Sequence, residues 1–204
     1  TGTAASFNKP RSITTDGTNL YVADQNNHRI RKIVISSGAV TTFAGSGSQG
    51  STDATTGTSA SFKFPSGITT DGTNLYVADR DNHIIRKIVK STGVVTTLAG
   101  SGSIGSTNGT GTAASFNKPD GITTDGTNFY VADTENHLIR KIVIATGVVS
   151  TIAGSTSAGS TDATGTAARF NKPRAITTDG TNLYVSDSSN HKIRKIVIST
   201  GVVT

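Results

Sequence analysis

Four histidines recur along the chain, at positions 28, 83, 137 and 191, and each follows an aspartate and an asparagine at the same spacing. In the first copy these residues are Asp24, Asn27 and His28. An imidazole next to a carboxylate is the arrangement of acid–base pairs and of many metal sites. The same residue types also close tight turns, where aspartate and asparagine bond the backbone and the histidine joins the network. Because every copy carries the same set, we expect a structural turn, with no metal and no cofactor.

Two further patterns have the composition of cation or catalytic sites. Asp16-Gly17-Thr18 resembles part of a calcium loop, but the additional acidic ligands of such a loop are missing, so we expect a turn. Serine, histidine and aspartate are abundant, yet no nucleophile stands apart from the repeat. Asp120, opposite Arg11 and Arg174, is the only candidate for an asymmetric centre. We therefore expect a protein that is not an enzyme.

These residues lie within a repeat that organises the whole chain. The four prolines and the four tyrosines keep the spacing of the histidines, 54 or 55 residues, and four copies account for all 204 residues. Only 33% of the residues are hydrophobic, but the repeat concentrates them into short segments between turns. The absence of cysteine excludes disulfide scaffolds, thiolate zinc sites and cysteine nucleophiles. The absence of methionine predicts a processed, excised or engineered piece.

Each copy reads as four short strands without a helix. In the first copy they are Ile13–Thr15, Leu20–Ala23, Ile30–Ile35 and Val40–Ala44, separated by turn residues such as Asp16-Gly17. Apolar residues occupy both faces of this antiparallel meander, so it must be covered on both sides. Identical sheets stacked around an axis meet that need. The sequence therefore predicts an all-β fold, a single β-propeller domain over 1–204, with blades at 9–45, 64–100, 118–154 and 172–204.

The most regular part of the repeat is similar to a known family. Tyr21–Ile33 reads Y-V-A-D-x-x-N-H-x-I-R-K-I, and it recurs at Tyr76–Ile88, Tyr130–Ile142 and, with a serine for the alanine, Tyr184–Ile196. Together with the preceding P-x-G-I segment, this pattern resembles the NHL repeat. The resemblance implies a propeller, typically of six blades, that recognises protein or RNA; a few relatives are lyases with a metal in the central channel. This chain has four copies of the repeat, which differs from the six blades typical of that family.

Three arrangements of the four blades remain open at this point. They close a narrow ring alone, they form part of a larger ring, or two chains meet in an eight-bladed ring. An unclosed stack exposes two apolar blade faces, which favours association, so we expect a monomer or a homo-oligomer through those faces. By analogy with the linkers, Thr1–Asn8 is expected to pack across the junction with the last blade and to close the ring.

The linkers between blades combine two kinds of segment. Their latter part repeats an alanine and a phenylalanine, such as Ala60 and Phe62, and each phenylalanine is expected to fill a blade junction at about 1.5–3 kcal/mol. The preceding stretch of Gly, Ser and Thr is expected to be flexible, at a modest cost in entropy.

Variation between the copies gathers at one end of the expected blades, the end with the second-to-third turns, the linkers and the starts of the first strands. We call this end the variable rim. The opposite end repeats Thr-Asp-Gly-Thr-Asn in every copy. The candidate ligand-binding residues on the variable rim are Arg11, Arg29, Arg80, Asp81, Asp120, Glu135, Arg174 and Lys192. The leading hypothesis is a non-enzymatic binding or scaffold module that recognises a protein or another ligand there.

Other functions depend on different features of the chain. Arginine–lysine pairs on the third strands, such as Arg31-Lys32, are expected near the blade exterior, paired with aspartates of a neighbouring strand. With the net charge of +6, they suggest RNA binding as an alternative. The variable rim, however, carries both signs of charge and lacks aromatic residues for base stacking. An engineered or recently duplicated repeat without a ligand, and a metal-dependent lyase, are further alternatives. No apolar stretch is long enough for a membrane helix, so no membrane partner is expected.

Overall fold

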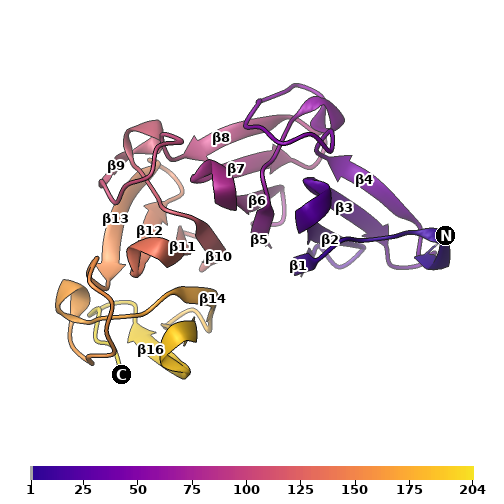
Figure 1. Ribbon diagram of the computed structural model, residues 1–204. Helices are drawn as coiled ribbons and strands as arrows, with labels where there is room; N and C mark the ends of the chain where they lie inside the picture. The colour runs from indigo at the N-terminus through magenta and orange to yellow at the C-terminus, as the bar shows by residue number, and fades with distance from the viewer. Residues whose placement is uncertain (1) are drawn as a thin grey trace.

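The computed structural model describes residues 2–204 and consists of short strands, tight turns and linkers. The strands form four antiparallel sheets that follow one another along the chain as the blades of a β-propeller, as Figure 1 shows. The predicted fold class is therefore confirmed. The β-branched and aromatic segments form the strands, because such side chains fit a pleated surface that is packed on both faces.

The first two blades each contain four strands in sequential order. The first blade consists of β1 (Pro10–Thr15), β2 (Asn19–Asp24), β3 (Arg29–Val34) and β4 (Val40–Ala44). The second consists of β5 (Pro65–Thr70), β6 (Asn74–Asp79), β7 (Ile84–Val89) and β8 (Val95–Ala99).

The last two blades vary this plan at their outer edges. The third consists of β9 (Gly109–Thr110), β10 (Pro119–Thr124), β11 (Asn128–Asp133), β12 (Leu138–Val143) and β13 (Val148–Ala153). Within it, β9 comes from the linker and pairs with β13. The fourth consists of β14 (Pro173–Thr178), β15 (Asn182–Asp187) and β16 (Lys192–Val197). Residues 202–204 take the place of its fourth strand, since Val203 pairs with Ile196.

Single turns of 3-10 helix occupy two kinds of position in the described chain. One kind lies in the linkers: η1 (Gly2–Ala4), η3 (Gly57–Ser59), η5 (Gly111–Ala113) and η7 (Gly165–Ala167). The other joins the second and third strands of each blade: η2 (Gln25–Asn27), η4 (Arg80–Asn82), η6 (Thr134–Asn136) and η8 (Ser188–Asn190). Within residues 2–204, no helix has the length and apolar composition needed to cross a membrane.

The hairpin between the first and second strands follows the turn chemistry that the sequence predicts. Asp16 accepts hydrogen bonds on Oδ1 from the backbone N–H groups of Thr18 (3.1 Å) and Asn19 (2.8 Å). Gly17 has φ of +85°, a left-handed conformation that glycine adopts without a steric cost. The Tyr21 hydroxyl donates to the second oxygen of Asp16 at 3.1 Å. The carboxylate thus serves the turn, as expected.

The hydrophobic core lies between the blades. At the first junction, Tyr21 and Ile30 of the first blade pack with Leu75 and Val77 of the second, and Phe62 from the linker is fully buried among them. Equivalent clusters fill the other two junctions. The prediction that the linker phenylalanines fill the junctions is confirmed there by Phe62, Phe116 and Phe170.

The four blades form an open arc, with the first and last blades at its two ends (Figure 1). Extensive packing joins the inner strands of consecutive blades, β1 to β5, β5 to β10 and β10 to β14. Ile13 on the first blade is 56% exposed, whereas its equivalent Ile68 is 4% exposed. Ile193 on the last blade is 72% exposed, whereas its equivalent Ile85 is buried. The four blades therefore do not close a ring by themselves, and the larger ring and the eight-bladed ring of two chains stay open as alternatives.

The N-terminal segment does not close a ring, so that expectation is wrong. Thr1 lies outside the described residues. The backbone N–H of Asn8 donates to Asp24 of the same blade at 2.8 Å, and Arg31 donates to the carbonyl of Ser6 at 3.1 Å. The segment therefore lies along the first blade, because the aspartate and arginine that bind it belong to that blade.

The Gly/Ser/Thr part of the linkers is also more ordered than expected. Ala54 pairs with Val95 at the outer edge of β8, and β9 and Thr164 make the equivalent pairings with β13 and Val202. Each linker thus adds a strand-like segment to the blade that follows it. The expectation of a flexible segment is wrong, because the backbone groups of the linker find partners along the blade edge.

Candidate functional site

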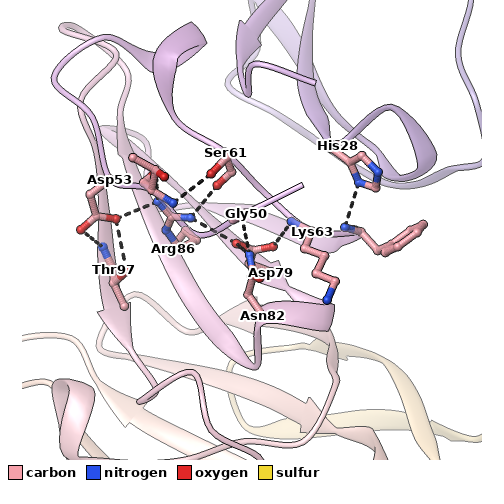
Figure 2. A network of polar contacts seen from close by, with 11 residues as sticks. His28, Gly50, Asp53, Ser61, Lys63, Asp79, Asn82, Arg86 and Thr97 are labelled. Carbon is pink, nitrogen blue, oxygen red and sulfur yellow. Dashed lines mark hydrogen bonds and ion pairs between the residues drawn. The ribbon is translucent and has the colours of Figure 1, made fainter. Parts of the chain in front are cut away.

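The repeated aspartate, asparagine and arginine form a network in each blade, and Figure 2 shows that of the second blade. The carboxylate of Asp79 is fully buried. It accepts hydrogen bonds from the Lys63 backbone N–H (2.7 Å), the Asn82 amide (2.8 Å) and the Arg86 guanidinium (3.1 Å). Asn82 also donates to the carbonyl of Gly50 at 2.6 Å, which ties the linker to the turn.

The arginine of this network is buried, not exterior as the sequence suggested. Arg86 has no exposed surface, although its predicted pairing with an aspartate of the neighbouring strand is confirmed. It donates to the carbonyls of Ser61 (2.9 Å) and Thr52 (3.0 Å) and pairs with Asp53 at 2.7 Å. The linker covers the guanidinium. The alternation of residues along the strand does not predict this cover, because the linker is distant in sequence. Arg140 and Arg194 repeat the arrangement.

Each histidine except the last connects its blade to the next. His28 Nδ1 accepts a hydrogen bond from the backbone N–H of Phe64 at 3.2 Å, as Figure 2 shows. His83 and His137 accept the equivalent bonds from Lys118 (3.0 Å) and Lys172 (3.1 Å). Burial lowers the pKa of these three histidines. The triad of aspartate, asparagine and histidine is therefore structural, and residues 2–204 contain no cluster of metal-ligating side chains.

An asymmetric group of polar side chains lies where the inner strands meet at the axis. The second residue of each inner strand is Arg11, Ser66, Asp120 or Arg174. The buried carboxylate of Asp120 accepts a hydrogen bond from the Ser66 hydroxyl, and it pairs with the Arg11 guanidinium at 3.2 Å. This contact spans the second blade, since Arg11 belongs to the first blade and Asp120 to the third.

These side chains line an open cavity of about 290 Å³, which we call the axial basin. Its lining residues are Lys9, Arg11, Gln25, Asn26, Phe64, Arg80, Asp81, Asp120 and Arg174. Arg80 pairs with Asp81 at 2.6 Å, so each carboxylate in the basin has an arginine partner. Two cationic groups, those of Lys9 and Arg174, remain in excess. The basin therefore favours anionic ligands.

Glycine on the inner strands lets the blades approach closely enough to build the basin. A Cβ atom on Gly67 would overlap the carbonyl oxygen of Asp120 and would lie 2.9 Å from the backbone nitrogen of Ile122. Gly121 stands in the same relation to the carbonyl of Arg174. Backbone-to-backbone contact thus explains the glycine at the second and third junctions, whereas Ser12 occupies the equivalent position at the first junction.

The structure brings together five of the eight predicted ligand-binding residues and separates the other three. Arg11, Arg80, Asp81, Asp120 and Arg174 line the axial basin. The other three lie elsewhere: Arg29 donates to the carbonyl of Ser46 at 3.1 Å, Glu135 pairs with Lys172 at 3.2 Å, and Lys192 is exposed at the start of β16.

Four lining residues were not among the candidates: Lys9, Gln25, Asn26 and Phe64. Lys9 and Phe64 occupy the position just before the proline of each copy. Phe64 replaces the lysine found at 9, 118 and 172, and this break in the repeat was the available signal. Its ring packs edge-on against His28, with 4.6 Å between ring centres. The statement that the variable rim lacks aromatic residues is corrected by Phe64.

Comparison with known proteins agrees with this architecture. The family model of the NHL repeat matches residues 116–142. NHL repeat-containing protein 2 from Homo sapiens is 35% identical over 145 residues, which cover 65% of this chain and 20% of that protein. The chain therefore spans about a fifth of this curated relative.

Two solved structures from Bacteroides thetaiotaomicron share the fold. A structural genomics protein of unknown function has a TM-score of 0.75 and 26% identity, covering 97% of this chain and 48% of the other. An auxiliary nutrient binding protein has a TM-score of 0.68 and 22% identity, covering 90% of this chain and 46% of the other. The repeated motif, the blade architecture and these similarities agree in identifying NHL repeats in this chain.

Proposed function

We propose that the protein is a non-enzymatic binding module that holds an acidic segment of a partner protein in the axial basin. The observation that carries this proposal is the convergence of Arg11, Arg80 and Arg174, from three different blades, on one open cavity. A guanidinium group binds a carboxylate through two parallel hydrogen bonds, so it suits glutamate and aspartate side chains.

The charge distribution in the basin supports an anionic ligand. Asp120 is 6% exposed and already occupied by Arg11 and Ser66, while Arg174 is exposed and has no ion pair among the described residues. An incoming carboxylate therefore meets a free guanidinium without displacing a buried ion pair. Because the site is open to solvent, we expect the affinity to fall as the salt concentration rises.

The bonding of the carboxylates and histidines supports a binding role over catalysis. Both carboxylates of the basin are held in ion pairs, and His28 and His83 use their Nδ1 atoms to bind the backbone of the next blade. A general base needs a free lone pair within reach of a substrate. The carboxylates of the basin and the Nδ1 atoms of these histidines are thus already engaged in other interactions.

The test is a binding titration with a hexaglutamate peptide, with a hexalysine peptide as the charge control. We expect salt-sensitive binding of the acidic peptide, with affinity lowered at least tenfold by Arg174→Ala and further by adding Arg80→Ala. Lys192→Ala removes a cation outside the basin and serves as the matched control. Equal affinities for Arg174→Ala, Lys192→Ala and the unsubstituted protein would contradict the proposal.

A single-stranded oligouridine probe separates this proposal from RNA recognition. Phe64, the aromatic residue in the lining, packs against His28, so its ring is engaged in the blade junction. We therefore expect weak RNA binding that is unchanged by Phe64→Leu. Tighter binding of oligouridine than of hexaglutamate, lost on Phe64→Leu, would favour RNA and contradict the peptide proposal.

A further inference from the structure

The two ends of the arc expose complementary apolar surfaces. The N-terminal face, on the first blade, includes Phe7, Ile13, Val22 and Ile33, which line an apolar groove of about 310 Å³. The C-terminal face, on the last blade, includes Ile193, which is 72% exposed. Isolated exposed apolar residues are common on proteins, but a contiguous apolar blade face indicates an interaction surface.

The chain itself shows what covers such faces. At the first junction, Tyr21, Ala23 and Ile30 form the C-terminal side, and they correspond to Tyr184, Ser186 and Ile193 on the last blade. The opposing side contains Ile68, Val77 and Ile88. These residues correspond to Ile13, Val22 and Ile33 on the first blade. The same pairing of surfaces occurs at all three internal junctions. The exposed C-terminal face therefore keeps the tyrosine and isoleucine of the surfaces that already cover N-terminal faces within the chain, with Ser186 in place of their alanine.

A hydrogen bond that crosses every internal junction is also prepared at the two ends. Phe64, Lys118 and Lys172 donate their backbone N–H groups to histidines while holding φ values of 51–52°. Lys9 holds the same left-handed conformation, with φ of 51°, and among residues 2–204 its N–H has no acceptor. The Nδ1 atom of His191, the histidine of the last blade, likewise accepts no hydrogen bond within the described chain. Donor and acceptor thus lie on opposite ends of the arc.

We propose that two copies of this chain pair head to tail, each C-terminal face covering the N-terminal face of the other. Both exposed faces are then buried at junctions of the internal type, and His191 accepts the Lys9 N–H of the other copy. The resulting ring has eight blades, within the range of four to eight that propellers use. Because the two junctions between the copies are the same, the pair has closed twofold symmetry.

Sedimentation equilibrium of the 204-residue chain tests the pairing. We expect a mass of twice 20.9 kDa. Ile13→Asp and Ile193→Asp should each raise the dissociation constant at least tenfold, because each places a charge in an apolar junction. Ile104→Asp, at an exposed linker position outside both faces, is the matched control and should leave the mass unchanged. Circular dichroism checks that each variant keeps its fold.

Mixing the two face variants tests the head-to-tail orientation. Ile13→Asp retains an intact C-terminal face and Ile193→Asp an intact N-terminal face, so the mixture should form dimers through one intact junction although neither variant does so alone. Pairing of like faces predicts that one variant stays dimeric and that mixing restores nothing, and this result would overturn the proposal. A folded unsubstituted chain that stays at 20.9 kDa, or one that grows into larger species with concentration, would overturn it as well.

Discussion

The Nδ1 atom of His83 lies 3.0 Å from the backbone nitrogen of Lys118 and accepts its hydrogen from the neighbouring blade. His83 holds φ of 59°, in the left-handed region, as the residue that ends η4. The bond requires an unprotonated Nδ1 atom. A residue of the second blade thus positions the segment that leads into the third, and the strength of this connection depends on pH.

The first prediction concerns that dependence. Burial lowers the pKa of His28, His83 and His137, so the unfolded chain binds protons more readily than the folded one below about pH 6.5. Their contribution to stability is present above that pH and is lost as the pH falls through the lowered values. Asparagine tolerates the left-handed conformation and does not titrate. In urea unfolding at pH 7.5 and 5.5, we therefore expect the triple substitution of these histidines by Asn to remove their share of the pH dependence.

The comparison with the triple variant is needed because nearby carboxyl groups change the stability with pH in the opposite direction to the histidines. Burial raises the pKa of Asp79 and Asp133 to about 6, so they favour the folded state as the pH falls toward 4. Asp81, Lys118 and Glu135 also act on the histidines through their charges. An unchanged difference in stability between the two pH values in the triple variant would show that the histidines do not couple the junctions to pH.

The second prediction concerns the buried arginine of the second blade. Arg86→Leu leaves the fully buried carboxylate of Asp79 without its cation, and we expect a loss of about 3–5 kcal/mol in the free energy of unfolding. Arg31 is the matched position in the first blade, where the side chain is 13% exposed and lacks a linker carboxylate such as Asp53. Denaturant titration should show a smaller loss for Arg31→Leu. Equal losses would mean that the linker contacts of Arg86 contribute little.

The third prediction tests the close approach of the inner strands. Gly67→Ala places a methyl group against the backbone of Asp120 and Ile122, so we expect a loss of about 1–3 kcal/mol. Ala175 occupies the equivalent position in the last blade, where no following blade packs within the chain. Ala175→Gly should therefore cost only about 0.4–1 kcal/mol, through the added freedom of the unfolded chain. Calorimetric melting that ranks the two variants in the reverse order would contradict this account of the basin.

The fourth prediction concerns the tyrosine beneath the first hairpin. Burial, reinforced by the hydrogen bond to Asp16, raises the pKa of Tyr21 to about 12. The folded chain then holds this proton between about pH 10 and 12, where the unfolded chain loses it, so stability falls as the pH rises through that window. Asp16→Asn should lower the pKa of Tyr21 in an alkaline absorbance titration. A titration curve identical to that of the unsubstituted chain would rule out the hydrogen bond as a cause.

The internal repeat made much of the local structure predictable. The Asp16-Gly17 turn, the strands and the burial of Phe62 follow from residue types and alternation, which act over a few neighbouring residues. The position of Arg86 was mistaken, because its burial depends on a linker more than 30 residues away whose composition suggested flexibility. Local patterns do not reveal which distant backbone groups cover a side chain.

The candidate site likewise has features that the sequence predicts and features that only the tertiary structure decides. Comparison of the four copies identified Arg11, Asp120 and Arg174 as departures from the repeat. Their location at the variable rim could be predicted from the sequence alone. Their convergence in the axial basin, and the ion pair between Arg11 and Asp120 across the second blade, were decided by how closely the inner strands pack and how far the blades turn about the axis. The open arc was likewise decided in three dimensions. The three internal junctions share one design that specifies what each blade binds next, whereas the rotation accumulated over successive junctions determines whether the ends meet.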